Sequence, residues 1–380
     1  MKSFNYLHKP TLLILTAVTL AFPASAAPTW QRLHLPIPGQ QAGYDFPVYA
    51  NHKLSGDLSV LRDIREVIIV QHGIQRNGDD YYAAAMALLQ ASGRSLGEVL
   101  VLAPNFPGKP DVDNPGKGFD GMPVWSVQGW TGGDDALPGT GTQTGLSSLQ
   151  VLDDIAQLLA DKSRLPSLKK IIFAGHSGGG QLIHRYAVLN HVDEALRARG
   201  LDVQYVVANP SSYLYFTPDR PDRSVPGSFA PYDKTICPAY DDYRYGMQDM
   251  VAYAKGMSGM DLYIRHLQRQ VSYLVGSLDT DPNHRVLDKS CGAEAEGPTR
   301  YDRAHAYWSY EQYLGKHTPV AKHMPTTASH HYFDVQGVGH DQSKIFGSLC
   351  GVKLLFGDKA VVDKQAATCN EMDFRSRQTQ

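Results

Sequence analysis

The sequence has little excess charge and none of the cysteine pairs that hold most small metal sites. Its 380 residues include 36 Lys and Arg against 38 Asp and Glu, so no basic surface for nucleic acid is expected. None of the four cysteines lies in a C-x-x-C pair, which argues against the common zinc modules and redox motifs. Internal repeats, heptad runs and low-complexity tracts are also absent. With 42% hydrophobic residues, the chain is too apolar to be disordered throughout and long enough for one large domain or two ordinary ones.

Long hydrophobic runs are lacking as well, apart from a short one near the N-terminus. Two lysines precede the apolar run 12–22, and the small residues 24–26 follow it. This order is typical of a secretory signal peptide over residues 1–26, and the run is about half of the ~20 residues that a membrane span needs. The sequence therefore predicts an exported protein, periplasmic or secreted, with residues 27–380 as the mature chain and no stable membrane span.

Export changes the meaning of the four cysteines. An even number of cysteines in an oxidising compartment favours disulfides, and four of them allow three pairings. The sequence does not choose among the pairings, but we favour Cys237–Cys291 and Cys350–Cys369, the second of which would close a short loop near the C-terminus. Free buried thiols are the alternative.

Apolar, β-rich runs alternate with helical patterns along the mature chain. Continuous apolar strands are typical of a parallel sheet that is covered on both faces. The alternation therefore predicts an α/β domain with right-handed crossovers. The predicted buried strands are 67–70, 99–102, 171–174, 205–208 and 271–275, and helical patterns between them include 81–90 and 148–159.

Two stretches break this alternation. Residues 106–145 form a long loop rich in Gly and Pro, and loops of this length tend to be functional or disordered. Residues from about 211 to 265 are an aromatic-rich insertion that we interpret as a cap over a pocket, with a surface excursion pinned by Cys237 as the alternative. Aromatic side chains of both stretches suggest an apolar substrate pocket, although they would serve equally as the cap's own core. The candidates are Trp125, Trp130, Tyr213, Tyr215, Tyr243 and Tyr245.

The strongest local pattern is Gly175-His176-Ser177-Gly178-Gly179. It follows the predicted strand 171–174 and precedes a helical run, 181–190, which is the setting of a G-x-S-x-G nucleophile elbow. Glycines are needed beside such a serine because a Cβ would collide with the neighbouring strand and helix. The turn lifts the hydroxyl above the sheet edge at the positive end of a helix. We predict that Ser177 is a nucleophile rather than an ordinary turn serine.

A nucleophilic serine needs a base, and the base needs an orienting acid that precedes it in the chain. Asp279 directly follows the predicted strand 271–275, at the end of the strand where ligands bind in open α/β sheets. Asp281 is the second candidate for the acid.

The base is predicted in a loop near the C-terminus. His340 lies in a Gly-rich loop after the strand-like run 332–335 and before a helical pattern. The chain has 15 histidines, but the adjacent pair His330 and His331 lies before that run and thus at its wrong end. We therefore favour His340.

The loop after the first predicted strand is a candidate oxyanion hole. In this arrangement one donor is the backbone N–H after the nucleophile, here Gly178. The second is expected from Ile74, with Gln75 next. We expect His72 to shape this loop, and Arg76 either to bind a substrate carboxylate or to form a structural salt bridge.

The chain resembles the α/β-hydrolase superfamily in the order of four features: the His-Gly loop, the elbow, Gly-x-x-Asp after a strand, and Gly-His near the end. In finer detail it resembles the secreted bacterial esterase-like and lipase-like members. The resemblance covers about residues 60–358 and implies a mostly parallel eight-stranded sheet with a Ser177–His340–Asp279 triad. It implies hydrolysis of a small or polymeric carboxylic ester without a cofactor. One large domain with a cap then explains the chain better than two domains. A peptidase or amidase on the same scaffold and a non-catalytic binding protein are the alternatives.

Three weaker patterns do not support a metal or phosphate site. The run that begins at Asp111 has Pro115 and Met122 where an EF-hand loop needs calcium ligands. The Gly-rich stretch 139–145 lacks the Gly-Lys-Ser/Thr ending of a phosphate loop. Adjacent His330 and His331 alone make a weak metal site. We therefore predict no metal ligands from the sequence.

Overall fold

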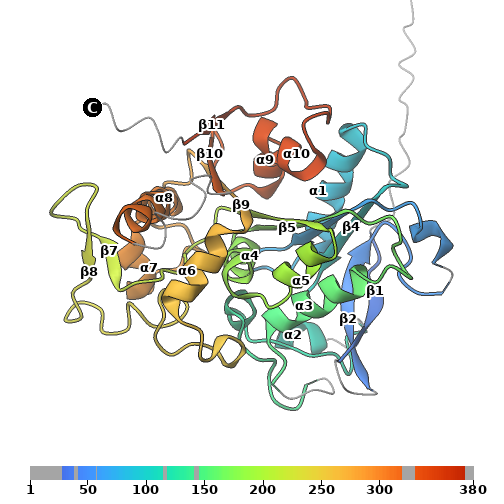
Figure 1. Ribbon diagram of the computed structural model, residues 1–380, viewed down its shortest axis with the longest axis horizontal. Coiled ribbons are helices and arrows are strands. Elements are labelled where there is room, and N and C mark those ends of the chain that lie inside the picture. The colour runs from blue at the N-terminus through green and yellow to red at the C-terminus, as the bar shows by residue number, and fades with distance from the viewer. Residues whose placement is uncertain are drawn as a thin grey trace, which may run out of the picture.

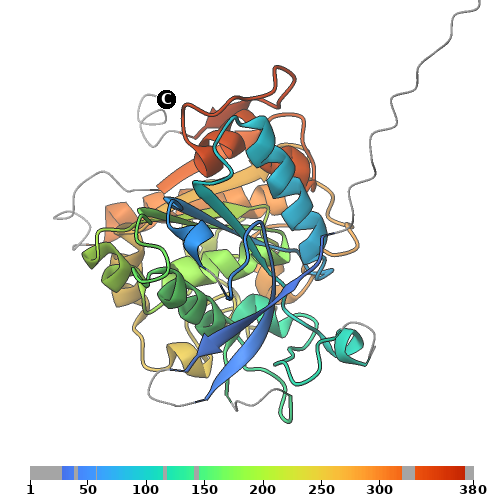
Figure 2. The same ribbon diagram turned by 90° about the vertical axis from the view of Figure 1, so that its right-hand side faces the viewer.

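The structure, a computed structural model, describes residues 28–37, 42–56, 58–113, 118–140, 145–318 and 330–372. The expected signal peptide, residues 1–26, lies outside the described residues. A twisted sheet runs through the centre of the molecule and helices cover both of its faces (Figure 1 and Figure 2). This layered arrangement is the α/β architecture that the alternation of strand and helix patterns predicts.

The central sheet is mostly parallel. Its strands lie in the order β1-β2-β4-β3-β5-β6-β9-β10-β11, and the interior neighbours from β4 to β10 are all parallel. The two N-terminal strands and the last strand pair antiparallel. The strands are β1 (Gln31–Pro36), β2 (Gly43–Ala50), β3 (Glu66–Gln71), β4 (Val99–Pro104), β5 (Lys170–His176), β6 (Asp202–Ala208), β9 (Gln270–Gly276), β10 (His330–Val335) and β11 (Cys369–Glu371).

All five strands predicted from apolar runs are present, as β3, β4, β5, β6 and β9. The structure adds the N-terminal pair β1 and β2, which the sequence analysis does not predict. Side chains of β1 alternate between buried and exposed positions, because this strand lies at the edge of the sheet. A search for continuous apolar runs does not find such a strand.

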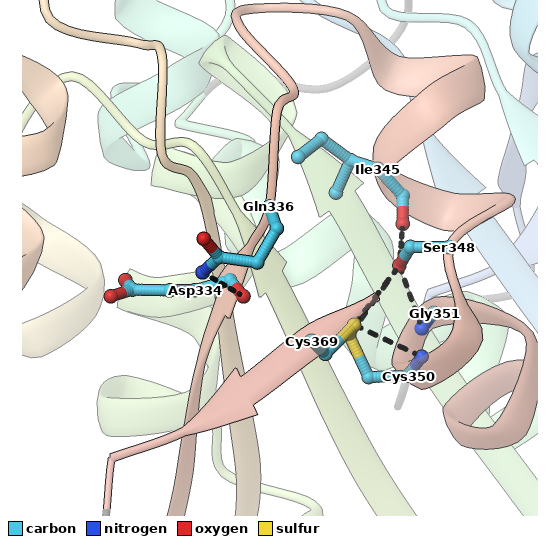
Figure 3. Close-up of a disulfide and its surroundings, with 7 residues drawn as sticks. All are labelled: Asp334, Gln336, Ile345, Ser348, Cys350, Gly351 and Cys369. Carbon is cyan, nitrogen blue, oxygen red and sulfur yellow. Dashed lines mark hydrogen bonds between the residues drawn. A yellow bond between two sulfur atoms is a disulfide. The ribbon is translucent and has the colours of Figure 1, made fainter. Parts of the chain in front are cut away.

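The sheet has nine strands in the described residues, one more than the resemblance implies. The additional strand is β11, which has three residues and pairs antiparallel with β10. A disulfide between Cys350 and Cys369 joins β11 to the helix α10 (Leu349–Phe356) (Figure 3). The segment Cys369-Asn370-Glu371 is too short and too polar for hydrophobic periodicity to predict, so its place in the sheet depends on this covalent link and on its pairing.

Two layers of helices bury the two faces of the sheet. Helices α1, α9 and α10 form one hydrophobic core with the sheet, and α3, α4, α6 and α8 contribute to the other (Figure 2). None of the helices among the described residues is long and apolar enough to cross a membrane. The helices are α1 (Gly78–Ala91), α2 (Lys109–Val112), α3 (Ser148–Leu159), α4 (Gly178–Leu189), α5 (Asp193–Ala198), α6 (Gly259–Leu267), α7 (Cys291–Glu296), α8 (Arg300–His317), α9 (Gln342–Phe346) and α10 (Leu349–Phe356), with short 3₁₀ turns at Ser59–Leu61, Gly129–Gly132 and Ala252–Ala254.

Both favoured disulfide pairings are confirmed. Cys237 is bonded to Cys291, and Cys350 is bonded to Cys369. The first bond ties the aromatic-rich stretch to the start of α7. The second closes a loop 19 residues long, a length for which the chain-entropy estimate is about 3 kcal/mol of stabilisation.

The two stretches that break the alternation combine buried and exposed segments in their described parts. The stretch 106–145 contains a 3₁₀ turn, and both of its tryptophans are buried. The stretch 211–265 contains the small hairpin β7 (Asp219–Pro221) and β8 (Phe229–Pro231), followed by α6. In Figure 1 this hairpin lies beside α7 and α8, away from the central sheet.

Candidate active site

Ser177 occupies a sharp turn between β5 and α4. Its φ of 59° and ψ of −121° are strained values for a residue with a Cβ. The flanking glycines are required here, because a Cβ on Gly175 would overlap the carbonyl of Gly179 and a Cβ on Gly179 would overlap the carbonyl of Gln71. The serine hydroxyl is thereby held at the carboxyl end of β5 and at the N-terminus of α4.

The structure brings His340 and Asp279 to this serine from two separate loops. His340 Nε2 lies 2.9 Å from Ser177 Oγ, and His340 Nδ1 lies 2.7 Å from Asp279 Oδ2. Both distances are within hydrogen-bond reach for a nucleophile, its base and an orienting acid. Because a carboxylate accepts a hydrogen bond, Nδ1 carries the imidazole proton and Nε2 is left to accept the proton of the serine hydroxyl.

Asp281, the second candidate for the acid, has a different role. Its Oδ1 accepts a hydrogen bond from the backbone N–H of Asn283 at 2.8 Å. It therefore shapes the loop after β9, while Asp279 at the start of the same loop faces His340.

Two residues that the sequence analysis does not identify hold the Asp279 carboxylate. Asn209 donates from Nδ2 to Oδ2 at 2.6 Å, and Arg300 donates from Nη1 to Oδ1 at 3.3 Å. Burial alone raises the pKa of Asp279, but the hydrogen bond and charge of His340, with Arg300 and Asn209, more than offset it and hold the pKa at about 2. The acid is therefore an anion at neutral pH.

The imidazole of His340 is neutral at the same pH. Burial lowers its pKa, the Asp279 carboxylate opposes that effect, and the Arg300 guanidinium adds to it, so the pKa stays below its usual value. A neutral imidazole is able to take a proton from Ser177. The ring of His176 lies beside that of His340, with 4.5 Å between centroids, and Tyr81 holds His176 through its hydroxyl at 3.1 Å from Nδ1.

The two predicted oxyanion donors, Gly178 and Ile74, lie on neighbouring segments of the backbone. A Cβ on Gly178 would lie only 3.1 Å from the backbone nitrogen of Ile74. His72 shapes this loop as expected, since its Nδ1 bonds to Gly73 O at 2.8 Å and its Nε2 accepts from Phe106 N at 3.0 Å. Burial lowers the pKa of His72 to about 4, which leaves the ring neutral.

Arg76 forms the structural salt bridge that was one of its two expected roles. Its Nε lies 3.0 Å from Asp111 Oδ2, and both side chains are largely buried. The same Asp111 oxygen accepts the backbone N–H of Gly108. The first residue of the rejected calcium pattern is thus engaged with protein groups.

Four of the six aromatic residues suggested as pocket walls lie in the protein core, and Tyr243 and Tyr245 are partly buried. Trp125, Trp130, Tyr213 and Tyr215 are all at most 1% exposed. Trp130 stacks on Phe106, with 5.5 Å between ring centroids. Of the two roles considered from the sequence, internal packing is the one that this burial supports, because a side chain with no exposed surface has no free face for a substrate.

The strand order, the elbow and the order of the three residues along the chain define the α/β-hydrolase fold, and this chain has that fold. No protein-family model and no curated protein matches the sequence. Among solved structures, the chain is similar to LpqC, a poly(3-hydroxybutyrate) depolymerase from Bordetella parapertussis, with 20% identity, a TM-score of 0.56, and coverage of 87% of this chain and 89% of that one. It is also similar to poly(aspartic acid) hydrolase-1 from Sphingomonas sp. KT-1, with 18% identity, a TM-score of 0.55, and coverage of 87% and 99%.

Proposed function

We propose that the protein is an exported serine hydrolase that cleaves carboxylic esters through an acyl-enzyme. The observation that carries the proposal is the hydrogen-bonded line from Ser177 Oγ through His340 to Asp279, set in a strained elbow. The fold supports the proposal, and so does the likeness to a structure named for a polyester depolymerase. The two disulfides and the N-terminal segment 1–26 support export.

In the proposed reaction, Ser177 Oγ attacks the ester carbonyl as its proton passes to His340 Nε2. Asp279 keeps the imidazole in the required tautomer and stabilises the imidazolium that forms. The backbone N–H groups of Gly178 and Ile74 donate to the developing oxyanion. His340 then gives the proton to the leaving alcohol, and the same histidine activates a water molecule that releases the acid from Ser177. No step in this sequence calls on a metal or an organic cofactor.

We also propose that residues 27–380 act as one domain and that the insertion of about 211–265 bounds the substrate site. The stretch begins beside the triad acid, because Asn209 bonds to Asp279 and Ser211 Oγ accepts from Arg300 Nε at 2.9 Å. A change in this stretch is therefore expected to alter which acyl or alcohol groups fit, and a panel of esters that differ in each group measures that selectivity.

Replacing the proposed nucleophile tests the function directly. The variant Ser177→Ala should lose roughly 10⁴- to 10⁶-fold in kcat on p-nitrophenyl esters, which is what loss of a triad member costs. Its thermal unfolding temperature should stay close to that of the unchanged protein, since one hydroxyl is removed. Ser95→Ala, at an exposed loop position, is the matched control and should keep full activity. Esterase activity that survives in Ser177→Ala would show that Ser177 is not the nucleophile. If the unchanged protein has no esterase activity and a fluorophosphonate does not label Ser177, a non-catalytic binding role is left.

Amide hydrolysis is the second candidate, because a similar structure is named for a poly(amino acid). Ester and amide cleavage use the same triad, so specificity depends on the pocket. Turnover of a p-nitrophenyl ester and of the matched p-nitroanilide compares the two. The ester proposal requires a higher kcat/KM for the ester than for the anilide. The ratio of the two values must also exceed the ratio of the intrinsic, uncatalysed reactivities of the two substrates.

A further inference from the structure

A second cluster of chemically active side chains lies at the opposite end of the strand β10 from the triad. It consists of His266 at the end of α6, Glu311 in α8 and His330 at the start of β10. All three are buried, and their candidate ligand atoms lie within 4.8 Å of one another. His330 begins the strand that ends before the His340 loop, so β10 separates the two sites along its length.

Backbone carbonyls determine where the protons of the two histidines lie. His266 Nδ1 is 3.2 Å from Ala187 O, and His330 Nε2 is 2.9 Å from His266 O. Because a carbonyl only accepts hydrogen bonds, each of these nitrogens is the donor. In each neutral ring the other nitrogen then carries a lone pair. A histidine that donates one ring N–H to a carbonyl and presents the other nitrogen inward is arranged as metal-binding histidines are.

Both lone pairs face the carboxylate of Glu311. His266 Nε2 lies 3.4 Å from Glu311 Oε1, and His330 Nδ1 lies 2.8 Å from Glu311 Oε2. The Tyr273 hydroxyl lies 3.1 Å from His266 Nε2 and can donate to its lone pair, but the lone pair of His330 Nδ1 and the carboxylate repel one another unless a positive charge lies between them. Glu311 is the only acid among these three side chains, so the charge must come from a proton or from a metal ion.

Unpartnered oxygens gather around the same point. Glu311 Oε1 and the hydroxyls of Tyr307 and Tyr332 are buried and make no hydrogen bond of ordinary geometry to a described residue. Both tyrosines pack against Tyr273, with ring centroids 5.8 and 4.5 Å apart. The hydroxyl of Tyr273 lies 3.1 Å from His266 Nε2. Buried polar atoms without partners are rare in native proteins and often mark a bound water or ion.

We propose that His266, Glu311 and His330 bind one divalent transition metal ion of the zinc class. The donor set is two imidazole nitrogens and one carboxylate, which suits zinc better than calcium or magnesium. Bonds of about 2.0–2.1 Å at a tetrahedral centre place ligand atoms roughly 3.3 Å apart, close to the spacing of His266 Nε2 and Glu311 Oε1. The Tyr273 hydroxyl, 3.1 Å from His266 Nε2, is the candidate for the fourth position.

The metal ion would act on stability rather than on chemistry. Its ligands come from α6, α8 and β10, so one bound ion would link these three elements at the start of β10. Neither the metal nor its ligands reach Ser177, since β9 and β10 carry their catalytic residues at the other ends. Loss of the metal should therefore lower the unfolding temperature and leave kcat at 25 °C unchanged, whatever substrate the enzyme prefers.

The test compares metal content and unfolding in the whole mature protein and three variants. Protein is freed of metal by chelator, reconstituted with ZnCl₂, dialysed and analysed for metal, and its thermal unfolding is followed by calorimetry. One zinc ion per chain and a rise of roughly 5 °C in unfolding temperature are expected, as for a ligand well above its Kd. Glu311→Gln and His330→Gln should lose both. His331→Gln is the matched control, because this adjacent histidine is exposed and pairs with Glu371, and it should keep both.

Cobalt supplies a second readout if the variants fold poorly. Co²⁺ added to the metal-free unchanged protein should give the intense visible bands of a four-coordinate site, and one equivalent of Zn²⁺ should remove them. If the unchanged protein takes up no metal and shows no thermal shift, a buried proton or a water molecule occupies the cluster and the proposal is wrong. Metal binding that persists in folded Glu311→Gln and His330→Gln also overturns it, since the ion then lies elsewhere.

Discussion

At the scale of single residues, the acid of the proposed triad uses both of its oxygens. Oδ1 of Asp279 accepts from Arg300, and Oδ2 accepts from Asn209 and from His340. This fixes the plane of the carboxylate, and through it the orientation of the imidazole. Arg300 is itself held by Ser211 Oγ and by Val286 O, so its charge stays beside the acid. It is a positioning residue, because it acts through Asp279 and His340.

Removing the Arg300 charge should move the pH dependence of the reaction. Arg300 lowers the pKa of Asp279 and of His340, so Arg300→Gln should raise both. Catalysis needs neutral His340, and a higher pKa keeps that ring protonated to a higher pH. The acid limb of kcat/KM should therefore shift upward, so that the variant loses more of its activity at pH 6 than at pH 8.

Two variants separate charge from shape in this experiment. Arg300→Lys keeps the positive charge and should keep the acid limb close to that of the unchanged enzyme, whatever it does to kcat. Arg265→Gln, on α6, removes a guanidinium that pairs with Glu194 and should leave the limb in place. An acid limb that does not move in Arg300→Gln would mean that Arg300 serves only to pack the loop.

Local patterns in the sequence predict the three reacting residues but not those that support them. The structure brings Ser177, His340 and Asp279 together, and each is marked by glycines or by the end of an apolar strand. Asn209 also follows a strand, in the polar segment after β6. No sequence pattern around Asn209 indicates that its side chain bonds Asp279, seventy residues later. Arg300 begins a helix and pairs across the loop after β9. Contacts of this kind depend on the tertiary fold.

At the scale of elements, continuous apolar runs predict the interior strands because those strands are buried on both faces. All six positions of β3 and of β4 are buried. The edge strands β1 and β11 lack that pattern, and β2 is interrupted by Gly43, Asp45 and Pro47, which is why these three strands escape prediction. The helix α8 escapes for another reason, since it buries charged residues such as Arg303 and Glu311 that sequence patterns place on a surface. Their partners lie far away in the chain.

The disulfide at the end of the sheet should stabilise the fold without serving catalysis. Ser348 caps α10 beside the Cys350–Cys369 bond, and β11 adds three residues to the edge of β10 (Figure 3). The double variant Cys350→Ser/Cys369→Ser should lose about 3 kcal/mol of unfolding free energy and several degrees in unfolding temperature. Its kcat at 25 °C should remain near that of the unchanged enzyme.

Calorimetry and esterase assays with and without reductant check this expectation. The reductant should lower the unfolding temperature of the unchanged protein further than that of the double variant, which has only Cys237–Cys291 left to lose. A double variant with unchanged unfolding temperature would show that pairing with β10 alone holds β11.

At the scale of the whole molecule, the interior holds many histidines that are neutral when folded. Burial lowers the pKa of His72 to about 4, and it lowers the pKa values of His176 and His184 well below the usual range. Hydrogen bonds to other protein groups engage some of the ring nitrogens, such as the bond between His184 Nδ1 and the Tyr273 hydroxyl. In the metal-free protein His330 behaves in the opposite way, because Glu311 raises its pKa despite burial. Histidines with lowered pKa values outnumber it.

This imbalance predicts that the protein loses stability in mild acid. In the unfolded chain these histidines protonate near pH 6.5, while the folded protein keeps them neutral down to lower pH. Asp153 and Glu296 oppose this effect, because burial raises their pKa values to about 7 and about 8 and the folded state binds their protons first. Histidines with lowered pKa values outnumber these two carboxyls. The unfolded state therefore still binds more protons as the pH falls from about 6.5 towards 4, and the free energy of unfolding declines over that window. Each such histidine contributes up to ~1.4 kcal/mol per pH unit. In the metal-free protein, His330 adds a constant stabilisation below about pH 6.5, because both states bind its proton there, and it does not change the slope in this window.

Urea unfolding at a series of pH values from 7.5 to 4.5 measures the slope. The range stops at 4.5 because carboxylates with lowered pKa values, such as Asp279, begin to contribute below it. A variant such as His184→Asn removes one titrating ring and should flatten the slope by about one proton, even though it lowers stability at every pH. His317→Asn, at an exposed helix end, should leave the slope unchanged. A slope that is no flatter in His184→Asn than in the unchanged protein would mean that His184 is protonated in the folded protein, beside a compensating anion.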